Sequence, residues 1–299
     1  MPSENNSARQ APQYLIIPAA GLGTRMRSVD PLLPKELLPV GNKPAIQYTV
    51  EEGLSAGIHR FVIIINRQKE SIRRYFEDRR FRTGLYPEMD KGVESMCGDC
   101  SMTFLYQKEL LGEADAISYA EPVAGDHSVG VIYPDNLYMP APGAMKILRD
   151  AFAAYGKDAV ALSVVPPAVA ETVSNAGRVD IRHMEKNIYS IERFIPKSGG
   201  HFVPRFSNEL RSCGIFVSGP WIFEYIRRQR HTIEKGEFTD IHIRTPMVEE
   251  RGMIGCALPG TVFDIGNPAG YALCTREMGQ GRTHGAPPGQ ENSGKRSVQ

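Results

Sequence analysis

A buried strand that runs into a glycine-rich loop is the feature of this chain that most constrains its fold. The apolar run Tyr14–Ile17 leads into a loop that contains Gly21 and Gly23. Glycines at these places let the backbone approach a ligand where any side chain would clash. Peptide N–H groups in such a loop bind anions, and Arg25 and Lys35 add full positive charges. The pattern therefore predicts a phosphate-binding loop.

The spacing of the glycines excludes two common nucleotide-binding loops. Gly21 and Gly23 fit the first half of the dinucleotide-binding pattern G-x-G-x-x-G, but Met26 stands where the third glycine belongs. No Lys-Ser or Lys-Thr pair follows, as a P-loop requires. The loop is followed instead by the run Pro34-Lys35-Glu36-Leu37-Leu38-Pro39. The motif to be explained is thus a strand, then A-G-x-G-T-R, then P-K-E-x-L-P.

This order of motifs resembles the signature of the sugar nucleotidyltransferases, and within them the bacterial UTP:glucose-1-phosphate uridylyltransferases. Further segments resemble the blocks of that family in the same order: Lys43-Pro44 with Ile46-Gln47-Tyr48, Ala56-Gly57-Ile58, Lys69 with Ser71-Ile72 and Phe76, Tyr106-Gln107, Gly112, Pro134-Asp135, and Phe263-Asp264-Ile265-Gly266 with Gly270-Tyr271. The resemblance covers about residues 14–276 and is poorest over 83–101 and 197–211.

Apolar runs rich in Val and Ile alternate with amphipathic stretches, which is the pattern of β-α-β units. The pattern predicts strands at 14–17, 60–65, 102–106, 129–133 and 159–165, and helices at 45–56, 69–77, 114–120 and 144–155. Shorter segments predict strands at 177–183, 188–194 and 213–217, and helices at 220–230, 241–251 and 268–278. The pattern predicts an α/β fold with a Rossmann-like, doubly wound mixed sheet, and the resemblance implies that this sheet is of the nucleotide-diphospho-sugar transferase type. A small β-rich lobe is expected to fold over the mouth of this sheet on the sugar side.

Composition bounds the partners of the 299-residue chain. A formal net charge of +1 gives no field that would attract nucleic acid, and no apolar stretch approaches the ~20 residues that span a membrane. A polar N-terminus without a hydrophobic signal and an odd number of cysteines, five, favour a cytoplasmic protein. We expect one nucleotidyltransferase domain over 14–278, between a disordered N-terminus (1–13) and a disordered tail (279–299) that is almost free of apolar residues.

The resemblance implies that a sugar-1-phosphate oxygen attacks the α-phosphorus of a nucleoside triphosphate and releases pyrophosphate. Because two anions must meet, positioning and charge neutralisation carry such a reaction. Asp135 ends a strongly apolar run, Asp264 follows another, and both resemble the paired magnesium-binding aspartates of the family. Mg²⁺ prefers one or two carboxylates together with phosphate oxygens and water. The alternative is that each aspartate merely caps a helix or stabilises a turn.

The nucleotide contacts follow from the same resemblance. Arg25 is expected to bind the β- and γ-phosphates, and Lys35 the α-phosphate with its developing charge; the alternative for Lys35 is a solvated loop. The amide of Gln107 offers one donor and one acceptor, which complement the N3–H and a carbonyl of uracil or thymine. The nucleotide-binding positions implied for this chain are Ala20, Gly21, Gly23, Gln107 and Gly112.

On the sugar side, the resemblance implies that Gly177, Glu192 and Arg193 bind the sugar phosphate. The chain departs from the family pattern here, since Glu192-Arg193-Phe194 stands where the family has Glu-Lys-Pro. Arg keeps the charge of Lys but differs in reach and geometry. Further departures are Glu113-Ala114-Asp115, in place of Leu-Gly-His, and the segment Glu237–His242, in place of Asp-Glu-Ile-Gln-Leu-Thr. Because of these departures, the sequence does not decide which base and which sugar-1-phosphate the protein binds.

The leading interpretation is a Mg²⁺-assisted enzyme that makes UDP-glucose and pyrophosphate from UTP and glucose-1-phosphate. One alternative is a relative that uses dTTP or another hexose-1-phosphate. Another is a catalytically inactive regulator that binds nucleotide sugars, against which the retention of Arg25, Lys35, Asp135 and Asp264 argues. By resemblance we expect small-molecule substrates and a homo-oligomer, either a dimer or a tetramer.

Overall fold

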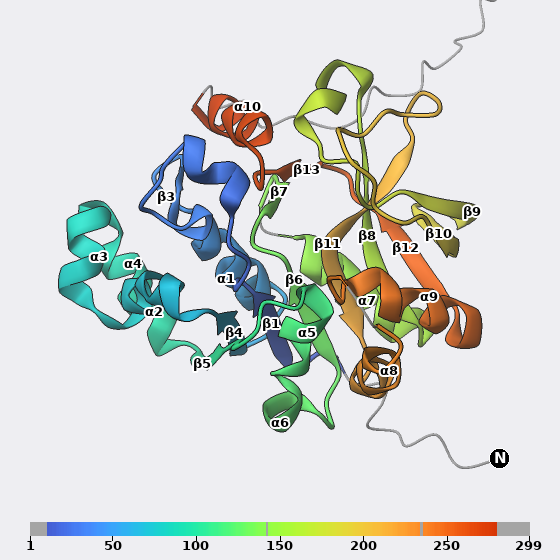
Figure 1. Ribbon diagram of the computed structural model, residues 1–299, viewed down its shortest axis with the longest axis horizontal. Helices are drawn as coiled ribbons and strands as arrows, with labels where there is room; N and C mark the ends of the chain where they lie inside the picture. The colour runs from blue at the N-terminus through green and yellow to red at the C-terminus, as the bar shows by residue number, and fades with distance from the viewer. Residues whose placement is uncertain (1–10, 142, 234–235, 280–299) are drawn as a thin grey trace, which may run out of the picture.

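A mixed sheet runs through the centre of the protein in the order β5-β4-β1-β6-β11-β8-β12-β10-β9 (Figure 1). The computed structural model describes residues 11–141, 143–233 and 236–279. Within these ranges the strands of the sheet are β1 (Tyr14–Pro18), β4 (Arg60–Ile65), β5 (Ser101–Tyr106), β6 (Val129–Ile132), β8 (Asp158–Val164), β9 (Val179–Glu185), β10 (Ile188–Phe194), β11 (Leu210–Ser218) and β12 (Met253–Ala257). All of them run in one direction except β10 and β11, so the sheet is mostly parallel.

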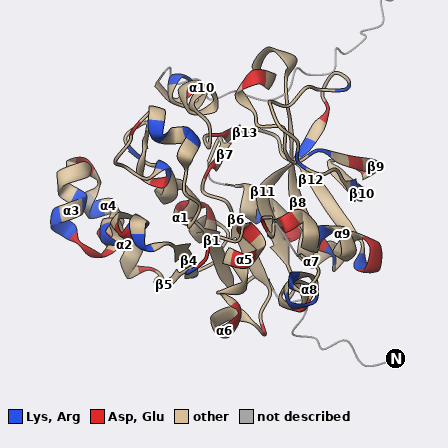
Figure 2. Ribbon diagram, in the orientation of Figure 1, with Lys and Arg blue, Asp and Glu red and all other residues tan. Residues whose placement is uncertain are grey.

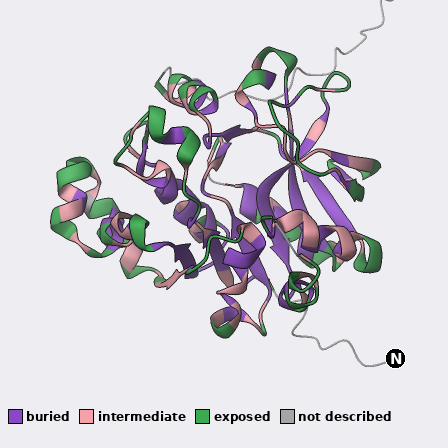
Figure 3. Ribbon diagram, in the orientation of Figure 1, coloured by how far each residue is buried: buried purple, intermediate pink, exposed green. Residues whose placement is uncertain are grey.

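Helices cover both faces of this sheet, which confirms the doubly wound α/β fold predicted from the sequence (Figure 1). Strand β1 shows why both faces are covered. Leu15 and Ile17 join the apolar cluster on one face, and Ile16 joins the cluster on the other. A strand buried on both faces reads as a continuous apolar run, and Figure 3 shows the central strands buried along most of their length. The helices are α1 (Ala45–Ser55), α2 (Glu70–Glu77), α4 (Asp90–Gly98) and α7 (Ala144–Tyr155) on the first face, and α5 (Glu113–Ser118), α6 (Glu121–Ala124), α8 (Trp221–Arg230) and α9 (Asp240–Arg251) on the second.

Shorter elements complete the described part of the chain. The poorly matching segment 83–101 holds the end of one unpredicted helix and the whole of another, α4; the first is capped by the Asp78 side chain, which accepts a hydrogen bond from Phe81 N at 3.0 Å. The remaining elements are α3 (Arg79–Leu85), α10 (Pro268–Gly279), β2 (Pro39–Val40), β3 (Lys43–Pro44), β7 (Asn136–Met139), β13 (Thr261–Asp264) and the 3-10 helices at 24–28, 35–37, 67–69, 87–89 and 167–172.

The β-rich segments after β8 do not fold over the mouth of the sheet as a lobe of their own. Strand β11 lies inside the main sheet, antiparallel between β6 and β8, and the β9–β10 hairpin extends the same sheet at its edge. Burial explains the position of β11, because Ile215 and Val217 pack on one face of the sheet and Phe216 on the other. A strand that is apolar on both faces is stable only inside a covered sheet.

The charges and the chain ends bear on the expected partners. Lys, Arg, Asp and Glu are interspersed over the ribbon, in line with the net charge of +1 (Figure 2). In the part of the chain that the structure describes, no helix is both long and apolar enough to cross a membrane. The segments predicted to be disordered are 1–13 and 279–299, and of these the residues 1–10 and 280–299 lie outside the described residues. The domain boundaries at 14 and 278 therefore stay a prediction.

Candidate active site

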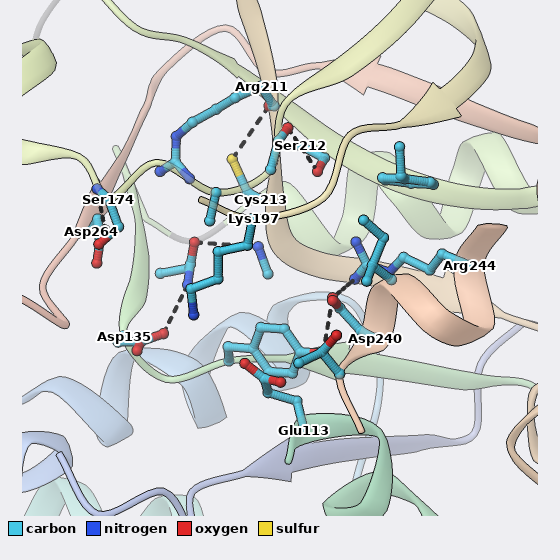
Figure 4. Close-up of a pocket in the computed structure, with 18 of the residues that line it drawn as sticks. Glu113, Asp135, Ser174, Lys197, Arg211, Ser212, Cys213, Asp240, Arg244 and Asp264 are labelled. Atoms are coloured by element: carbon cyan, nitrogen blue, oxygen red, sulfur yellow. Dashed lines mark hydrogen bonds and ion pairs between the residues drawn. The ribbon is translucent and has the colours of Figure 1, made fainter. Parts of the chain in front are cut away.

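Two adjoining cavities lie at the carboxyl end of the parallel strands, where open α/β sheets bind ligands. The loop cavity is lined by the glycine-rich loop 20–25, Lys35, Gln107 and Gly112. The arginine cavity, shown in Figure 4, is lined by residues that include Gly177, Lys197, Arg211, Arg244 and Asp264. The two cavities are halves of one cleft, because both are lined by Arg25, Glu113, Tyr133 and Asp135.

The glycine-rich loop presents free backbone donors to the loop cavity. Gly23 adopts a left-handed φ of 62°, which favours glycine. Two side chains hold the loop from behind: Lys69 Nζ donates to Ala19 O at 3.0 Å, and Asn66 Nδ2 donates to Ala20 O. Within the described residues, nothing accepts from the N–H groups of residues 21–23. This arrangement suits a phosphate, as the sequence predicted.

Lys35 lies where the two cavities meet and pairs with Asp135. Its Nζ is 2.5 Å from Asp135 Oδ2, and both side chains are largely buried. Burial alone would raise the pKa of Asp135, but the charge and hydrogen bond of Lys35 and the amide of Asn136 lower it to about 2. Burial alone would lower the pKa of Lys35, but the carboxylates of Asp135 and Glu36 raise it. Both groups are therefore charged at neutral pH, and Lys35 does not lie on a solvated loop.

A second, deeper ion pair fixes the segment that carries Lys35. Lys69 Nζ donates to both oxygens of Glu36 at 2.8 Å, and both side chains are almost fully buried. The same ammonium binds the carbonyl of Ala19 at the end of β1. Because buried charges need partners, this pair ties the Lys35 segment to the glycine-rich loop.

Asp135 and Asp264 are far apart in sequence, and the antiparallel pairing of β7 with β13 brings them together. Asp264 stands opposite Asn136 in that pairing, and Ile265 N donates to Asp135 O at 2.9 Å. A Cβ built at Gly266 would lie 2.7 Å from Asp135 Oδ2 and 3.2 Å from Asp264 Oδ1. Only a glycine leaves the space between the two carboxylates open. Two carboxylates around such a space fit the coordination that Mg²⁺ prefers, with substrate oxygens completing the shell.

The metal would need those substrate oxygens. Among the residues described, no group of three or more His, Cys, Asp or Glu side chains is arranged to hold a metal by itself. Asp264 is also tied to the glycine-rich loop, since its Oδ2 accepts from Ser174 N and Ser174 Oγ accepts from Arg25 Nη1, both at 2.9 Å. Arg25, predicted as a phosphate ligand, thus stands between the loop and the carboxylate pair.

Gln107 and Gly112 line the far end of the loop cavity. Gln107 is buried, and its Nε2 donates to Gly112 O at 3.2 Å and to Asp115 Oδ2 at 2.7 Å. Gly112 has a φ of 119°, and a Cβ there would lie 2.5 Å from Phe238 O. The segment Glu237–His242, which departs from the family pattern, therefore packs directly on the loop expected to hold the base.

The two extra acidic residues of this region have different environments. Asp115 turns away from the cleft toward Gln107 and Arg230. Glu113 lines both cavities, and its Oε2 is buried without a hydrogen-bond partner among the described residues. Burial, together with the negative charge of Asp240, raises the pKa of Glu113 to about 7. Glu113 therefore gains and loses a proton near neutral pH.

The arginine cavity holds cationic groups that the protein leaves incompletely paired. Arg244 is only 4% exposed, with Nη2 at 3.1 Å from Asp240 Oδ2, and its Nε finds no partner in the described residues. Arg211 is equally buried; Nη2 donates to Val262 O, whereas Nε likewise finds none. Figure 4 shows Asp135 and Asp264 on one side of the cavity and Asp240 with Arg244 on the other. Both arginines line the cavity and keep hydrogen-bonding capacity that the described residues do not use.

The structure does not bring Glu192 and Arg193 to this cavity, which corrects their predicted assignment to the sugar phosphate. Arg193 is 68% exposed and pairs with Asp180 at 2.7 Å, and Glu192 pairs with Arg182 at 3.2 Å on the outer side of the hairpin. An irregular register at residues 191–193 of β10 turns these side chains outward. Lys197, which follows Pro196 beyond the end of the strand, lines the cavity instead.

A family model for nucleotidyl transferases matches residues 14–277. The chain belongs to the nucleotidyl transferase family. Among curated relatives, the UTP–glucose-1-phosphate uridylyltransferase YngB of Bacillus subtilis is 29% identical over 91% of each chain. A putative UTP–glucose-1-phosphate uridylyltransferase of Methanocaldococcus jannaschii is 30% identical over 89% of this chain and 93% of its own. A solved UDP-glucose pyrophosphorylase complexed with UDP-glucose has the same fold, with a TM-score of 0.74 at 24% identity over 91% of this chain and 100% of the other.

These comparisons confirm the resemblance predicted from the motifs of this nucleotidyl transferase. Most of its predicted site residues line the cleft: Ala20, Gly21, Gly23, Arg25, Lys35, Gln107, Gly112, Asp135, Gly177 and Asp264. Sequence reasoning missed Lys197, Arg211 and Arg244. Lys197 could have been found from the sequence. Pro196-Lys197 follows a predicted strand and has the two residue types of the Lys-Pro pair of the family in reversed order. Arg211 and Arg244 carry no local signal, because only the fold brings them together.

Proposed function

We propose that this nucleotidyl transferase transfers a uridylyl group from UTP to glucose-1-phosphate, forming UDP-glucose and releasing pyrophosphate. Its curated relatives carry the name of this activity. The observation that carries the proposal is the meeting of two cavities at the Lys35–Asp135 pair. One cavity has free backbone donors for a triphosphate, and the other has buried cations for a second anion. The two substrates would therefore meet beside Lys35.

In the reaction, an oxygen of the sugar phosphate forms a bond to the α-phosphorus of UTP. The bond between that phosphorus and the bridging oxygen to the β-phosphate breaks, and pyrophosphate leaves with the electron pair. The nucleophile is already ionised, so no catalytic base is required. The loop N–H groups and Arg25 hold the β- and γ-phosphates, and the Lys35 ammonium offsets the charge that develops at the α-phosphate.

Asp135 and Asp264 would hold Mg²⁺ in the space beside Gly266. When bound there, the ion supplies charge neutralisation to the phosphates that approach each other. The chain's own residues set up this site: Lys35 and Asn136 keep Asp135 ionised, and the backbone N–H groups of Ser174 and Gly266 orient Asp264.

On the sugar side, we assign the phosphate to Lys197 and Arg211 in place of Arg193. Lys197 lines the arginine cavity, and the buried Nε of Arg211 lacks an acceptor in the described residues. Asp240, which accepts from Tyr133 Oη at 3.1 Å, offers acceptor capacity to sugar hydroxyls, and Arg244 offers donors. Gly177 lines the same wall, where a Cβ would lie 2.1 Å from Ser212 O.

A second candidate uses dTTP instead of UTP. Uracil and thymine share their Watson–Crick edge, so the contacts of Gln107 favour both alike. The deciding assay incubates the full-length protein with each triphosphate, a panel of sugar-1-phosphates and Mg²⁺, and measures pyrophosphate. UTP with glucose-1-phosphate should give the highest kcat/KM. A higher kcat/KM with dTTP or with another sugar-1-phosphate would replace the proposed substrate. If no pair of substrates released pyrophosphate, the remaining interpretation would be a catalytically inactive regulator.

The family resemblance also leads us to propose a homo-oligomer, a dimer or a tetramer, in the cytoplasm. Sedimentation equilibrium of the full-length protein would measure its mass directly. A mass of about one chain, 33.1 kDa, would contradict the proposed assembly.

A further inference from the structure

Asp115 is a buried carboxylate behind the base end of the loop cavity. It lies in the first turn of α5 and is 1% exposed. Its Oδ2 accepts from Gln107 Nε2 at 2.7 Å, and its Oδ1 lies 2.5 Å from Arg230 Nη1. A carboxylate this deeply buried is stable only with such partners. Asp115 therefore couples a residue of the predicted base site to a cation on α8.

The pairing with Asp115 decides which way the Gln107 amide faces. An ionised carboxylate only accepts hydrogen bonds, so it must face the NH₂ group and not the carbonyl. Gly112 O, also an acceptor, lies 3.2 Å from the same Nε2. Both donors of the amide are thus occupied by the protein. Among the described residues no donor reaches Oε1, and Gln107 lines the loop cavity. The carbonyl is left for the ligand.

We propose that Asp115 is a positioning residue for base selection, which fixes Gln107 with its carbonyl available to the base. A fixed acceptor is matched by the ring N3–H of uracil or thymine. It opposes cytosine, whose N3 is itself an acceptor. This inference rests on the proposed function and deepens it. Asp115 lies in the segment Glu113-Ala114-Asp115, where the family pattern has Leu-Gly-His. The proposed positioning of Gln107 by a carboxylate is therefore a feature of this chain and not of the family pattern.

The test compares triphosphates in the full-length protein carrying Asp115→Asn. An asparagine at this place can donate or accept, so it no longer dictates the orientation of Gln107. The ratio of kcat/KM for UTP to that for CTP should fall at least about tenfold, the size of one lost discriminating hydrogen bond. The ratio of UTP to dTTP should stay unchanged, because uracil and thymine share the edge that Gln107 contacts.

Controls separate positioning from mere structural support. Asp150→Asn makes the same change at an exposed carboxylate on α7, paired with Lys146 and Arg149, and should leave all ratios as in the wild type. In a Gln107→Met background, Asp115→Asn should change the UTP-to-CTP ratio no further. If Asp115→Asn does not fold, Asp115→Asn with Arg230→Gln removes both charges of the pair and should give the same fall.

Two results would overturn the role of Asp115. One is a folded variant with the wild-type UTP-to-CTP ratio. The other is an equal fall in the UTP-to-CTP and UTP-to-dTTP ratios, which would indicate general damage to the cavity. Failure of the proposed function is a different result, because the unmodified protein would then release no pyrophosphate from UTP.

Discussion

The loop cavity and the arginine cavity hold their charges in different ways. In the loop cavity, Lys35 is paired with Asp135, and the neighbouring Glu36 is paired with Lys69. In the arginine cavity, Arg211 and Arg244 are as deeply buried, yet each keeps a nitrogen that finds no acceptor among the described residues. In the loop cavity the charges are therefore paired within the protein, whereas we expect a bound anion to complete the pairing in the arginine cavity. Catalytic rate should depend on the loop cavity and on the carboxylate pair Asp135 and Asp264, and affinity for the sugar phosphate on the buried cations of the arginine cavity.

The carboxylate pair should give the largest effect on rate. Asp264→Asn and Asp135→Asn each replace a charge that holds the proposed Mg²⁺ with a neutral amide, so kcat should fall by about a hundredfold to a thousandfold. Pyrophosphate release at saturating substrates and Mg²⁺ measures this, with Asp150→Asn as the control. Near-normal rates in both folded variants would rule out the metal assignment.

The buried pair behind the loop cavity should give the largest effect on stability. Burial lowers the pKa of Lys69, and Glu36 opposes this shift. Lys69→Met leaves the Glu36 carboxylate buried and unpaired, which should reduce the free energy of unfolding by about 3–5 kcal/mol. Lys146→Met, which breaks an exposed pair with Asp150, should cost less than about 1 kcal/mol. Chemical denaturation of both variants compares them, and equal losses would contradict the claim that the loop side is held by its buried pair.

Lys35→Ala isolates the catalytic part of the loop side. Because the ammonium acts on charge that develops at the α-phosphate, kcat should fall about a hundredfold while the KM for UTP changes much less. Steady-state kinetics with varied UTP separates the two constants. A rise in KM with an unchanged kcat would make Lys35 a binding residue only.

The difference between the cavities also explains how far the sequence could predict the site. The residues of the loop cavity stand in short motifs, so Gly21, Arg25 and Lys35 were recognisable from order and spacing alone. The alternation of apolar segments likewise predicted most strands and helices, because burial on both faces leaves a continuous apolar run. The position of β11 in the sheet could not be predicted from its own residues. A strand in the core is a continuous apolar run wherever it lies in the sheet.

The arginine cavity could not be predicted because tertiary packing assembles it. In β10, Ile191 and Phe194 are buried, whereas the two residues between them point outward at an irregular register. A shift of one residue moves a side chain to the opposite face, and periodicity cannot show it. Arg211 lies in β11 and Arg244 in α9, and only the fold brings them to one wall.

Exchanging the predicted and the observed cation tests this account directly. Lys197→Ala should raise the KM for glucose-1-phosphate about tenfold, the loss expected for one charged hydrogen bond, with a smaller change in kcat. Arg193→Ala should leave that KM unchanged, because Arg193 pairs with Asp180 outside the cavity. The reverse result, a raised KM in Arg193→Ala alone, would restore the assignment made from the motif.

The smallest effect concerns Glu113, which both cavities share. Its pKa is raised to about 7 by burial and by the charge of Asp240, so it is mostly neutral at pH 6 and mostly ionised at pH 8. The added negative charge repels the substrate phosphates, and the KM for glucose-1-phosphate should rise about threefold to tenfold across this range, on the order of 1 kcal/mol.

Glucose-1-phosphate itself titrates near pH 6, so the comparison must be made against Glu113→Gln, which stays neutral throughout. The variant keeps the shape of the side chain and the pH dependence of the substrate, and it should lose only the part of the rise that Glu113 causes. At pH 6 the two proteins should bind the sugar phosphate alike, and at pH 8 the variant should bind it more tightly. Parallel KM profiles of the two proteins over the whole pH range would show that the charge of Glu113 does not affect the binding of glucose-1-phosphate.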